Sequence, residues 1–409
     1  MDQFGISKLD LKRRNRMQIL KLLRQKGPTS RIDISAALEL TRAAVTIITN
    51  EMIEQGVIYE KGEMNLLGQK AARGRKKILL DINSNYKFAF GVVVDAGCIS
   101  IGLSNINGEV LDKQFYTLDP QDKRPQAVHK IREMIAGAKA NNCLDDSDIL
   151  GVGVGVSESE YARMQVAVEH YVPDLTGLKK ELEQAVGMPV TVHETVRALA
   201  LAEIDFDFKE QVKPRNMVFI RYGDEIDAAV VLQNRIYSGT NNRAARFGHM
   251  IVNPGGKECS CGRVGCTVTE ISRPALLGKV RQVYSKEQPP ALFEATGGNP
   301  DNVGVLVQNV SLQFADKPVA EIFKNGAEYF AIAVNHMITL FDPEKVVFFG
   351  DICLNKAFLE YVKARMAHLA HYRLEDMVKE SVISKKMIYL AGCAVAIREF
   401  FIERGGFDR

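Results

Sequence analysis

A cluster of three cysteines and one histidine constrains the middle of this chain more than any other feature of its sequence. Cys259, Cys261 and Cys266 form a C-x-C-x4-C motif, and Gly248-His249 ends ten positions before the first cysteine. Three thiolates and one imidazole complete a tetrahedral Zn²⁺ site and leave no coordination position for a catalytic water. Reduced cysteines without a metal are the alternative, but three of the chain's 7 cysteines fall within eight residues. We therefore expect one structural zinc ion, held by His249, Cys259, Cys261 and Cys266.

Length and composition indicate a globular protein of two or three domains. The chain has 409 residues, 46% of them hydrophobic, which is enough to form substantial cores. No stretch of 18 uncharged apolar residues occurs, so we expect no membrane insertion. The charged N-terminus does not resemble a signal peptide, and the four cysteines outside the cluster lack the spacing of a disulfide framework. These features favour a cytoplasmic location with reduced thiols.

The net charge of the chain is only +3, but it is distributed unevenly. Residues 1–80 contain 16 Lys and Arg against 8 Asp and Glu, a net charge of +8. The remaining residues have a net charge of −5. A basic N-terminal segment joined to an acidic body indicates a nucleic-acid-binding module attached to something else. A solvated basic face without a partner is the alternative.

The basic segment has the pattern of three short helices. Apolar residues recur at helical spacing over 15–25, and Gly27-Pro28 ends this first helix. Ser30 is the expected cap of a second helix that reaches residue 38, and Thr41 is the expected cap of a third that reaches residue 55. The short turn before the third helix is typical of a helix-turn-helix, whose last helix enters the major groove. A helical bundle for protein contact is the alternative.

Two expected strands follow, over 57–59 and 78–80, and the loop between them is strongly basic. Such a loop suits contact with phosphates or with the minor groove, and it makes the module winged. The N-terminal polar residues of the third helix are expected to contact base edges. The residues that we expect to contact DNA are Arg31, Thr41, Arg42, Thr46 and Asn50, with Arg73, Arg75 and Lys76 in the wing.

Two sets of residues together resemble the ROK family of repressors, open reading frames and sugar kinases. One is the zinc signature, with Gly248-His249 before the cysteine cluster. The other is N-terminal, where Ser30-Arg31, Gly56 and Gly74-Arg75-Lys76 match the DNA-binding domain of ROK repressors, which ROK sugar kinases lack. The resemblance extends over nearly the whole chain. It implies either a transcriptional regulator built on a sugar-kinase fold or a sugar kinase with an added DNA-binding domain.

The remainder of the chain alternates buried strands with helices. Apolar runs over 88–95, 150–156, 217–222 and 345–349 predict strands, and long helical patterns lie between them. This alternation predicts α/β layers, and the resemblance implies two actin-like, ribonuclease H-like lobes. The expected fold is therefore an α/β ROK body of two lobes behind an N-terminal winged helix-turn-helix. The expected domains are the winged helix-turn-helix at 1–82, a first lobe at 83–193 completed by the C-terminal helix 388–409, and a second lobe with the zinc site at 194–387.

The resemblance also identifies where a kinase would hold phosphates and its general base, and this chain departs from the family at each place. The first phosphate loop reads Asp95-Ala96-Gly97-Cys98-Ile99 instead of Asp-x-Gly-Gly-Thr, and the second reads Gly223-Asp224-Glu225-Ile226-Asp227 instead of Gly-Thr-Gly-Ile-Gly. We expect the three carboxylates of the second loop to repel phosphate, at about 1–4 kcal/mol per pair of like charges. Glu194 replaces the base Asp, and Arg246 replaces a sugar-binding Glu. We therefore expect no enzymatic activity; a glucokinase-like sugar kinase is the rival interpretation.

Four polar residues are candidates for binding an effector: His193, Glu194, Arg246 and His249. Arg246 in place of Glu reverses a charge and favours an anionic ligand, whereas a salt bridge between Arg246 and Glu194 would leave no ligand site. We expect a repressor of carbohydrate-related genes with a sugar or sugar-derivative effector. A regulatory protein partner is the alternative. Because a helix-turn-helix monomer reads few base pairs, we expect a homodimer or a dimer of dimers on double-stranded operator DNA.

Overall fold

The computed structural model divides into two compact units, each built from more than one segment of the chain. The first contains Met1–Ala167, Pro173–Lys213 and Ile388–Arg409, and the second contains Val168–Val172 and Pro214–Met387. The winged helix-turn-helix and the first α/β lobe therefore belong to one unit, to which the C-terminal segment returns. The residues that the structure describes are 8–63, 77–169, 172–208, 213–286, 290–303, 317–370, 374 and 376–407.

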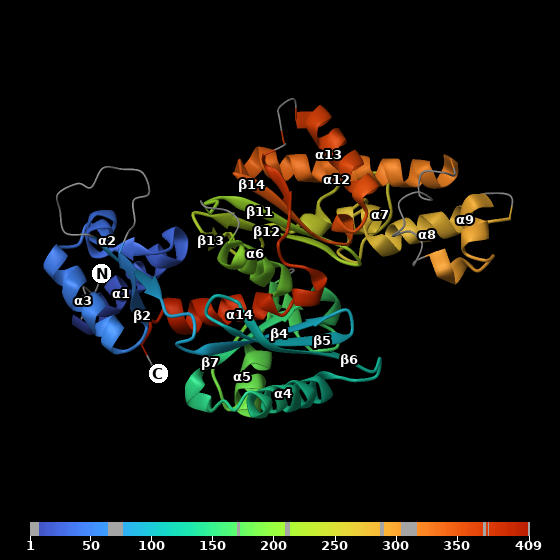
Figure 1. Ribbon diagram of the computed structural model, residues 1–409. Helices are drawn as coiled ribbons and strands as arrows, with labels where there is room; N and C mark the ends of the chain where they lie inside the picture. Colours follow the sequence, from blue (N-terminus) through green and yellow to red (C-terminus); the bar gives the residue numbers. More distant parts are fainter. Residues whose placement is uncertain are drawn as a thin grey trace. The chain divides into compact units, whose positions relative to one another are not determined.

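The N-terminal part of the first unit is a winged helix-turn-helix, as the sequence predicts (Figure 1). Both expected caps are confirmed, since Ser30 Oγ accepts the N–H of Asp33 at 3.3 Å and Thr41 Oγ1 accepts the N–H of Ala44 at 3.2 Å. The strands form an antiparallel sheet in the order β1-β3-β2. Its elements are α1 (Lys8–Lys26), β1 (Thr29–Ser30), α2 (Arg31–Leu38), α3 (Arg42–Glu54), β2 (Ile58–Glu63) and β3 (Ile78–Ile82).

The first lobe is a five-stranded mixed sheet with helices on both faces (Figure 1). The strand order is β10-β7-β4-β5-β6, in which β4, β7 and β10 run parallel and β5 and β6 run antiparallel to their neighbours. Helices α4 and α5 cover one face, and α6 and α14 cover the other. The bounds are β4 (Phe88–Asp95), β5 (Cys98–Asn105), β6 (Val110–Thr117), α4 (Arg124–Asn141), β7 (Ile149–Val156), α5 (Thr176–Val186), β10 (Val190–Glu194), α6 (Thr195–Phe206) and α14 (Leu390–Ile397).

Glycines allow α14 to lie directly on this sheet. A Cβ at Gly91 would lie 2.1 Å from the carbonyl oxygen of Tyr389, and a Cβ at Gly153 would lie 2.0 Å from that of Gly392. Both distances are far shorter than any van der Waals contact, so a side chain at either position would push the helix away. The Gly-Val alternation of β7 thus places small residues toward α14, while Val152 and its neighbours pack in the core on the opposite face.

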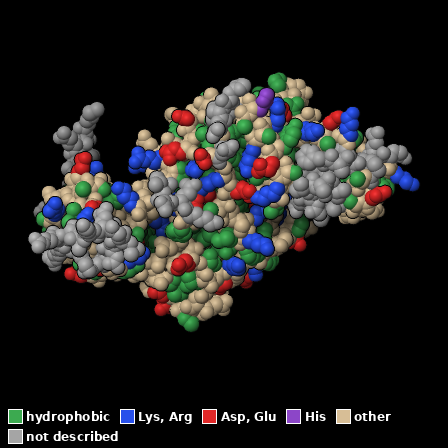
Figure 2. All heavy atoms as spheres, turned by 45° about the horizontal axis from the view of Figure 1, so that its top comes forward, with side chains coloured by type: hydrophobic (Ala, Val, Ile, Leu, Met, Phe, Trp, Pro, Cys, Tyr) green, Lys and Arg blue, Asp and Glu red, His purple; other side chains and the backbone are tan. Residues whose placement is uncertain are grey.

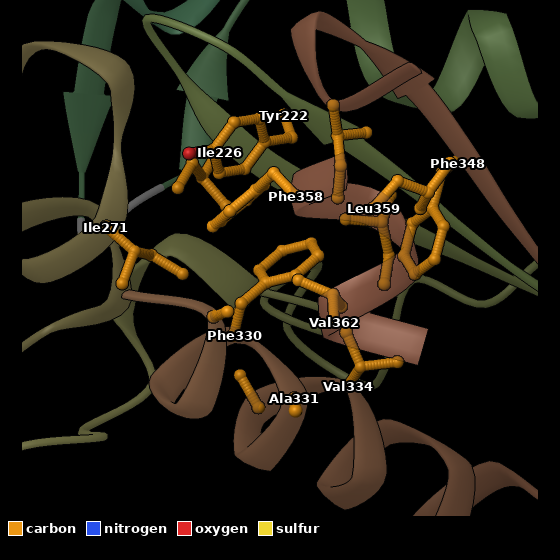
Figure 3. Close-up of a cluster of buried hydrophobic side chains, with 14 of the residues drawn as sticks. Tyr222, Ile226, Ile271, Phe330, Ala331, Val334, Phe348, Phe358, Leu359 and Val362 are labelled. Carbon is orange, nitrogen blue, oxygen red and sulfur yellow. The ribbon is translucent and has the colours of Figure 1, made fainter. Parts of the chain in front are cut away.

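The second unit has a five-stranded sheet in the order β13-β12-β11-β14-β15, packed against α7, α8, α12 and α13. Aromatic rings fill its core, where the ring of Phe330 lies 5.3 Å from that of Tyr222 and 5.7 Å from that of Phe348 (Figure 3). The bounds are β11 (Met217–Tyr222), β12 (Ile226–Leu232), β13 (Arg235–Ile236), α7 (Thr267–Ile271), α8 (Arg273–Val283), α9 (Pro290–Ala295), α12 (Lys317–Phe341), β14 (Lys345–Gly350), α13 (Lys356–Ala370) and β15 (Val378–Glu380).

The remaining elements are short, and the predicted α/β class is confirmed. Helix α6 lies in the first unit, whereas the sequence places residue 194 at the start of the second lobe.

Among the described residues, no helix combines the length and the apolar character needed to cross a membrane. Figure 2 shows acidic and basic side chains interspersed over the face that it presents, in keeping with the small net charge. The short elements are β8 (Ala167–Glu169), β9 (Val172–Asp174), the π-helical turn Arg398–Ile402, and 3₁₀ turns at Asp146–Asp148, Glu158–Glu160, Phe247–His249, Pro300–Asn302, Asp351–Cys353 and Lys385–Met387.

Candidate nucleic-acid interface, metal centre and kinase-like loops

Helix α3 has one buried face and one face exposed to solvent. Val45, Ile48 and Met52 lie in the core of the winged helix-turn-helix. Because Thr41 caps the helix, Arg42 lies at its N-terminal end, where recognition helices contact base edges. The exposed face includes two residues that the sequence reasoning did not single out, Ala43 and Ile47. The exposed residues of the helix are Arg42, Ala43, Thr46, Ile47, Asn50 and Glu54.

Arg31 holds this helix in place from its partner α2. Its guanidinium donates to Thr49 Oγ1 at 3.1 Å and to Asn50 Oδ1 at 3.0 Å. A third hydrogen bond, at 2.9 Å, reaches Glu60 Oε1 on β2. Arg31 therefore connects three elements and fixes the side chain of Asn50, so its place in the structure is that of a positioning residue.

The hydroxyls of the two threonines on α3 serve the helix itself. Thr41 caps it, and Thr46 donates to the carbonyl oxygen of Arg42 at 2.8 Å, a local bond typical of threonine in helices. Both side chains remain exposed. The predicted wing contacts, Arg73, Arg75 and Lys76, lie outside the described residues, although the two strands that flank them pair as expected.

The structure brings the four predicted metal ligands together. One ligand atom each from His249, Cys259, Cys261 and Cys266 lies within 4.8 Å of the other three. Cys259 Sγ is 3.6 Å from His249 Nδ1, and Cys261 Sγ is 3.5 Å from Cys266 Sγ. Tetrahedral coordination with Zn–S of about 2.3 Å and Zn–N of about 2.0 Å separates ligand atoms by about 3.5–3.8 Å. The distances between these ligand atoms therefore suit a metal ion of the size of zinc.

A glycine makes this close arrangement possible. Gly265 has a φ of 73°, and a Cβ there would lie 1.5 Å from the carbonyl oxygen of Asn253. The N–H groups of Val252 and Asn253 both donate to the carbonyl of Gly265, at 2.9 and 3.2 Å. These bonds hold the segment after His249 against the segment that ends at Cys266, and so bring the imidazole to the thiols.

The thiols influence one another's ionisation. Burial opposes ionisation of Cys261, but the N–H of Arg263 and the thiols of Cys266 and Cys259 lower its pKa to about 7. Burial, together with the same neighbouring thiols, raises the pKa of Cys266 to about 12. One thiolate therefore forms readily, whereas three adjacent thiolates require a compensating cation. A divalent ion at the centre would supply that charge.

The four candidate effector residues are divided between the two units, with His193 and Glu194 in the first and Arg246 and His249 in the second. His193 Nε2 lies 3.0 Å from Thr191 Oγ1, and burial lowers the pKa of His193, so its ring is neutral at neutral pH. Glu194 occupies the N-cap position of α6, without a capping hydrogen bond from its side chain, and forms an ion pair with Arg197 at 3.3 Å. Arg246 precedes the turn that carries His249, whose Nδ1 faces the thiol cluster.

The first kinase-like loop is occupied by a carboxylate of the protein itself. Ala96 and Gly97 turn the chain between β4 and β5 with φ of 48° and 73°. The N–H of Gly97 donates to Glu160 Oε1 at 2.6 Å, and Glu160 Oε2 pairs with Arg163 at 2.8 Å. Glu160 is only 3% exposed. The N–H of Gly97 is thus already bonded to a carboxylate of the protein itself.

Ion pairs hold the second kinase-like loop. Arg221 donates to Asp227 at 2.7 and 2.9 Å and also contacts Glu225. Arg273 donates to Asp224 at 2.6 Å. Each of the three carboxylates therefore has an arginine partner. Two arginines serve three acidic groups, so the expected repulsion of phosphate by this loop stays a prediction. The loop's own N–H is also engaged, since Gly223 donates to the carbonyl oxygen of Glu225 at 3.0 Å.

Comparison with known proteins identifies the family. Residues 96–391 match the model of the ROK family, and residues 12–59 match a model of winged helix-turn-helix DNA-binding domains. The chain belongs to the ROK family. It is 25% identical over 406 residues to the xylose repressor of Caldicellulosiruptor bescii, an alignment that covers 95% of this chain and 96% of that protein.

Solved structures place this ROK protein among regulators and kinases of one fold. A ROK family transcriptional regulator, a homologue of the Escherichia coli MLC protein, aligns over 97% of both chains with a TM-score of 0.70 and 25% identity. A ROK family glucokinase from Streptomyces griseus aligns over 76% of this chain and 99% of its own, with a TM-score of 0.62 and 21% identity. The glucokinase match shows the shared fold, and the regulator match extends over nearly the whole ROK chain.

Two buried arginines of α1 fasten the winged helix-turn-helix of the ROK protein to the rest of its unit. Arg16 is 0% exposed, donates to the carbonyl oxygen of Gly405 at 2.7 Å and stacks 3.9 Å from the ring centre of Phe407. Arg24 donates to the carbonyl oxygen of Ile106 at 2.5 Å, and its Nε lies 4.0 Å from Asp205 Oδ1. Asp205, near the end of α6, also accepts two bonds from Arg398, at 2.7 and 2.8 Å.

Sequence reasoning missed several residues that shape these sites in the ROK protein. The pair of Glu194 and Arg197 has a local signal, because residues three apart on a helix are neighbours. Glu160 has none, since it lies 63 residues from Gly97, and Arg273 likewise reaches the second loop from a separate helix. The signal for Ile47 was an isoleucine on the polar side of the predicted third helix.

Proposed function

We propose that this ROK protein is a transcriptional repressor that binds operator DNA through the exposed face of α3. The observation that carries the proposal is this face, on which Arg42 and Asn50 are exposed. Arg31 donates a hydrogen bond to Asn50, and residues 1–80, to which the helix belongs, have a net charge of +8. Arg42 and Asn50 contact base edges, while Arg31 positions Asn50. The wing residues Arg73, Arg75 and Lys76 contribute positive charge that attracts the DNA phosphates. Thr41, at the start of the helix, lies near the sugar-phosphate backbone of the DNA.

Selection of DNA by the full-length protein tests this proposal. Genomic fragments bound at moderate salt are sequenced, and the enriched sequence is titrated beside a random duplex. We expect a near-palindromic operator, bound roughly a thousandfold or more tightly than random DNA. Equal affinity for both duplexes would contradict the proposal.

The body is proposed to have no kinase activity. Three interactions support this. Glu160 accepts a hydrogen bond from the N–H of Gly97, and Gly223 donates to the carbonyl oxygen of Glu225 in the same turn. Glu194 forms an ion pair with Arg197. A phosphate would have to displace bonds that the protein already makes, and each such bond lost costs about 0.5–1.5 kcal/mol. A coupled assay with ATP across hexoses and amino sugars should show no turnover. Turnover of about 1 per second or more, within the ordinary enzyme range, would favour a sugar kinase with an added DNA-binding domain.

A structural zinc ion is proposed for the group formed by His249, Cys259, Cys261 and Cys266. The donor set and the spacing of the ligand atoms support zinc, which prefers nitrogen and sulfur ligands in tetrahedral sites. Four protein ligands leave no place for substrate or water, so the ion stabilises the fold. The protein purified without added metal should contain about one zinc per chain, and a metal-free protein of native stability would contradict this proposal.

The effector is proposed to be a sugar or a sugar derivative. Its candidate contacts are His193 and Glu194 in the first unit and Arg246 and His249 in the second. Helix α6 starts directly after Glu194, and Asp205 in its last turn lies against Arg24 of α1. The helix therefore offers a continuous buried element from an effector candidate to the DNA-binding domain. A thermal-shift screen of sugars, amino sugars and their phosphates tests this. A ligand at a hundred times its Kd should add about 2.7 kcal/mol of stability, and Asp205→Asn should keep that shift while weakening its effect on operator affinity.

The assembly is proposed to be a homodimer or a dimer of dimers in the cytoplasm, because a near-palindromic operator requires two copies of α3. A regulatory protein partner is the alternative to a small effector. Light scattering of the protein alone and with its operator checks the assembly, and a monomer bound to a full palindrome would contradict it.

A further inference from the structure

The exposed face of α3 carries an apolar strip between its polar ends. Ile47 is 69% exposed, and among the large hydrophobic side chains of the described residues only Leu340 is more exposed. Ala43 is exposed as well and lies one turn before Ile47 on the same face, because residues four apart on a helix are neighbours. A single exposed isoleucine is ordinary on a protein surface. This one follows Ala43 by one turn and precedes Asn50 on the helix that is proposed to read DNA, so we ask what it contacts there.

The polar side chains beside this strip have part of their hydrogen-bonding capacity engaged. Thr46 donates its one hydroxyl hydrogen to the carbonyl oxygen of Arg42, so no hydrogen is left for a base acceptor. Asn50 Oδ1 accepts from Arg31. The centre of the face therefore presents methyl and methylene groups, with the free hydrogen-bond donors at its ends.

We propose that Ile47, together with Ala43, contacts the C5-methyl group of thymine in the major groove. The inference rests on the proposed function, since it requires α3 to lie in that groove. Thymine is the one base whose major-groove edge carries a methyl group, and apolar side chains recognise it by contact. The operator therefore has thymine at the positions that lie under the centre of α3.

The surroundings of the strip fit a duplex rather than an apolar protein surface. Arg42 is exposed at the N-terminal end of the helix, and the segment of residues 1–80 has a net charge of +8, although the exposed Glu54 lies two turns after Ile47. A DNA duplex offers phosphates and base acceptors for the basic groups and a methyl group for Ile47.

Removal of single methyl groups from the operator tests the proposal. The preferred operator of the full-length protein is first selected from random DNA. Each thymine in it is then replaced by deoxyuridine, which lacks only the C5-methyl group, and binding is measured by fluorescence anisotropy. At one or two positions per half-site we expect about a fourfold loss of affinity, the value for one buried methyl group. In Ile47→Ala the same replacements should change affinity by less than about twofold.

Ile32→Ala is the matched control, because Ile32 is a 46% exposed isoleucine on α2 of the same domain. This variant should keep the full deoxyuridine effect, and thermal melting should show both variants folded. If no deoxyuridine weakens binding, or if the effect persists in Ile47→Ala, thymine reading by Ile47 is wrong. The proposed function fails separately, when no operator is selected or when Arg42→Ala and Asn50→Ala leave operator binding unchanged.

Discussion

The exposed face of α3 and the two kinase-like loops arrange their side chains in opposite ways. On α3, Arg42 and Ile47 are presented to solvent, and Asn50 is oriented by Arg31 from behind. In the loops, Gly97 is bonded to Glu160 and Asp224 to Arg273 of the same chain. A side chain exposed to water exchanges that water for a ligand at little net cost, whereas a side chain bonded inside the protein must first lose its partner. We infer that recognition belongs to the helix and that the loops have a structural role.

Removing a metal ligand should have the largest effect and tests the structural part of this comparison. Cys261→Ala should lose the metal and lower the free energy of unfolding of the second unit by several kcal/mol, because metal binding at a structural zinc site is coupled to folding. The measurement combines elemental analysis with chemical denaturation. Cys143→Ala is the control, since Cys143 is an exposed cysteine outside the cluster, and it should keep both metal and stability. Full stability of the metal-free Cys261→Ala protein would remove the structural role.

Glu160→Ala tests whether the first loop is held closed for stability. The change leaves the N–H of Gly97 without its bond and Arg163 without its partner, so we expect a loss of about 2–3 kcal/mol in unfolding free energy. Urea denaturation measures it, beside Glu158→Ala, an exposed glutamate of the same turn. ATP binding or sugar phosphorylation gained by Glu160→Ala would show that the loop is a masked phosphate site, contrary to the comparison.

Arg42→Ala tests the proposed role of the exposed face of α3 in binding DNA. Loss of a base contact should weaken operator binding by about 1–3 kcal/mol and relax sequence preference, while the unfolding free energy stays unchanged because the side chain is exposed. Titrations with operator and random duplexes at several salt concentrations separate specificity from charge. Arg235→Ala, an exposed arginine of the second unit, is the control. An equal loss on both duplexes would assign Arg42 to phosphate contact.

The sequence predicted the local parts of this molecule better than the long-range ones. Ser30 and Thr41 cap their helices as expected, because a cap depends on residues only three positions apart. The grouping of the three thiols could also be predicted from the sequence, since a short loop with Gly265 brings them together. The hydrogen bond from Gly97 to Glu160 could not be predicted, because it depends on how two segments distant in the sequence pack together.

The charge of the second loop shows the same limit. Three acidic residues within 223–227 predict repulsion when taken alone. The folded chain places Arg221 and Arg273 beside them, and Arg273 comes from the start of α8, 49 residues from Asp224. These two arginines offset part of the loop's negative charge. A count of charges along the sequence could not include a partner that only the fold supplies.

His193→Gln should have the smallest effect and tests whether this effector candidate is a buried neutral side chain. Burial lowers the pKa of His193 below its usual 6.5 in the folded state, so below about pH 6.5 the unfolded chain binds a proton that the folded chain does not. Stability should therefore fall as the pH decreases below 6.5, by at most about 1.4 kcal/mol per pH unit from this one group. Unfolding free energies between pH 7.5 and 5 should decrease less in His193→Gln than in the wild type. His129→Gln, which changes a largely exposed histidine, should keep the wild-type slope; equal slopes in all three proteins would mean that His193 titrates freely and is open to solvent or ligand.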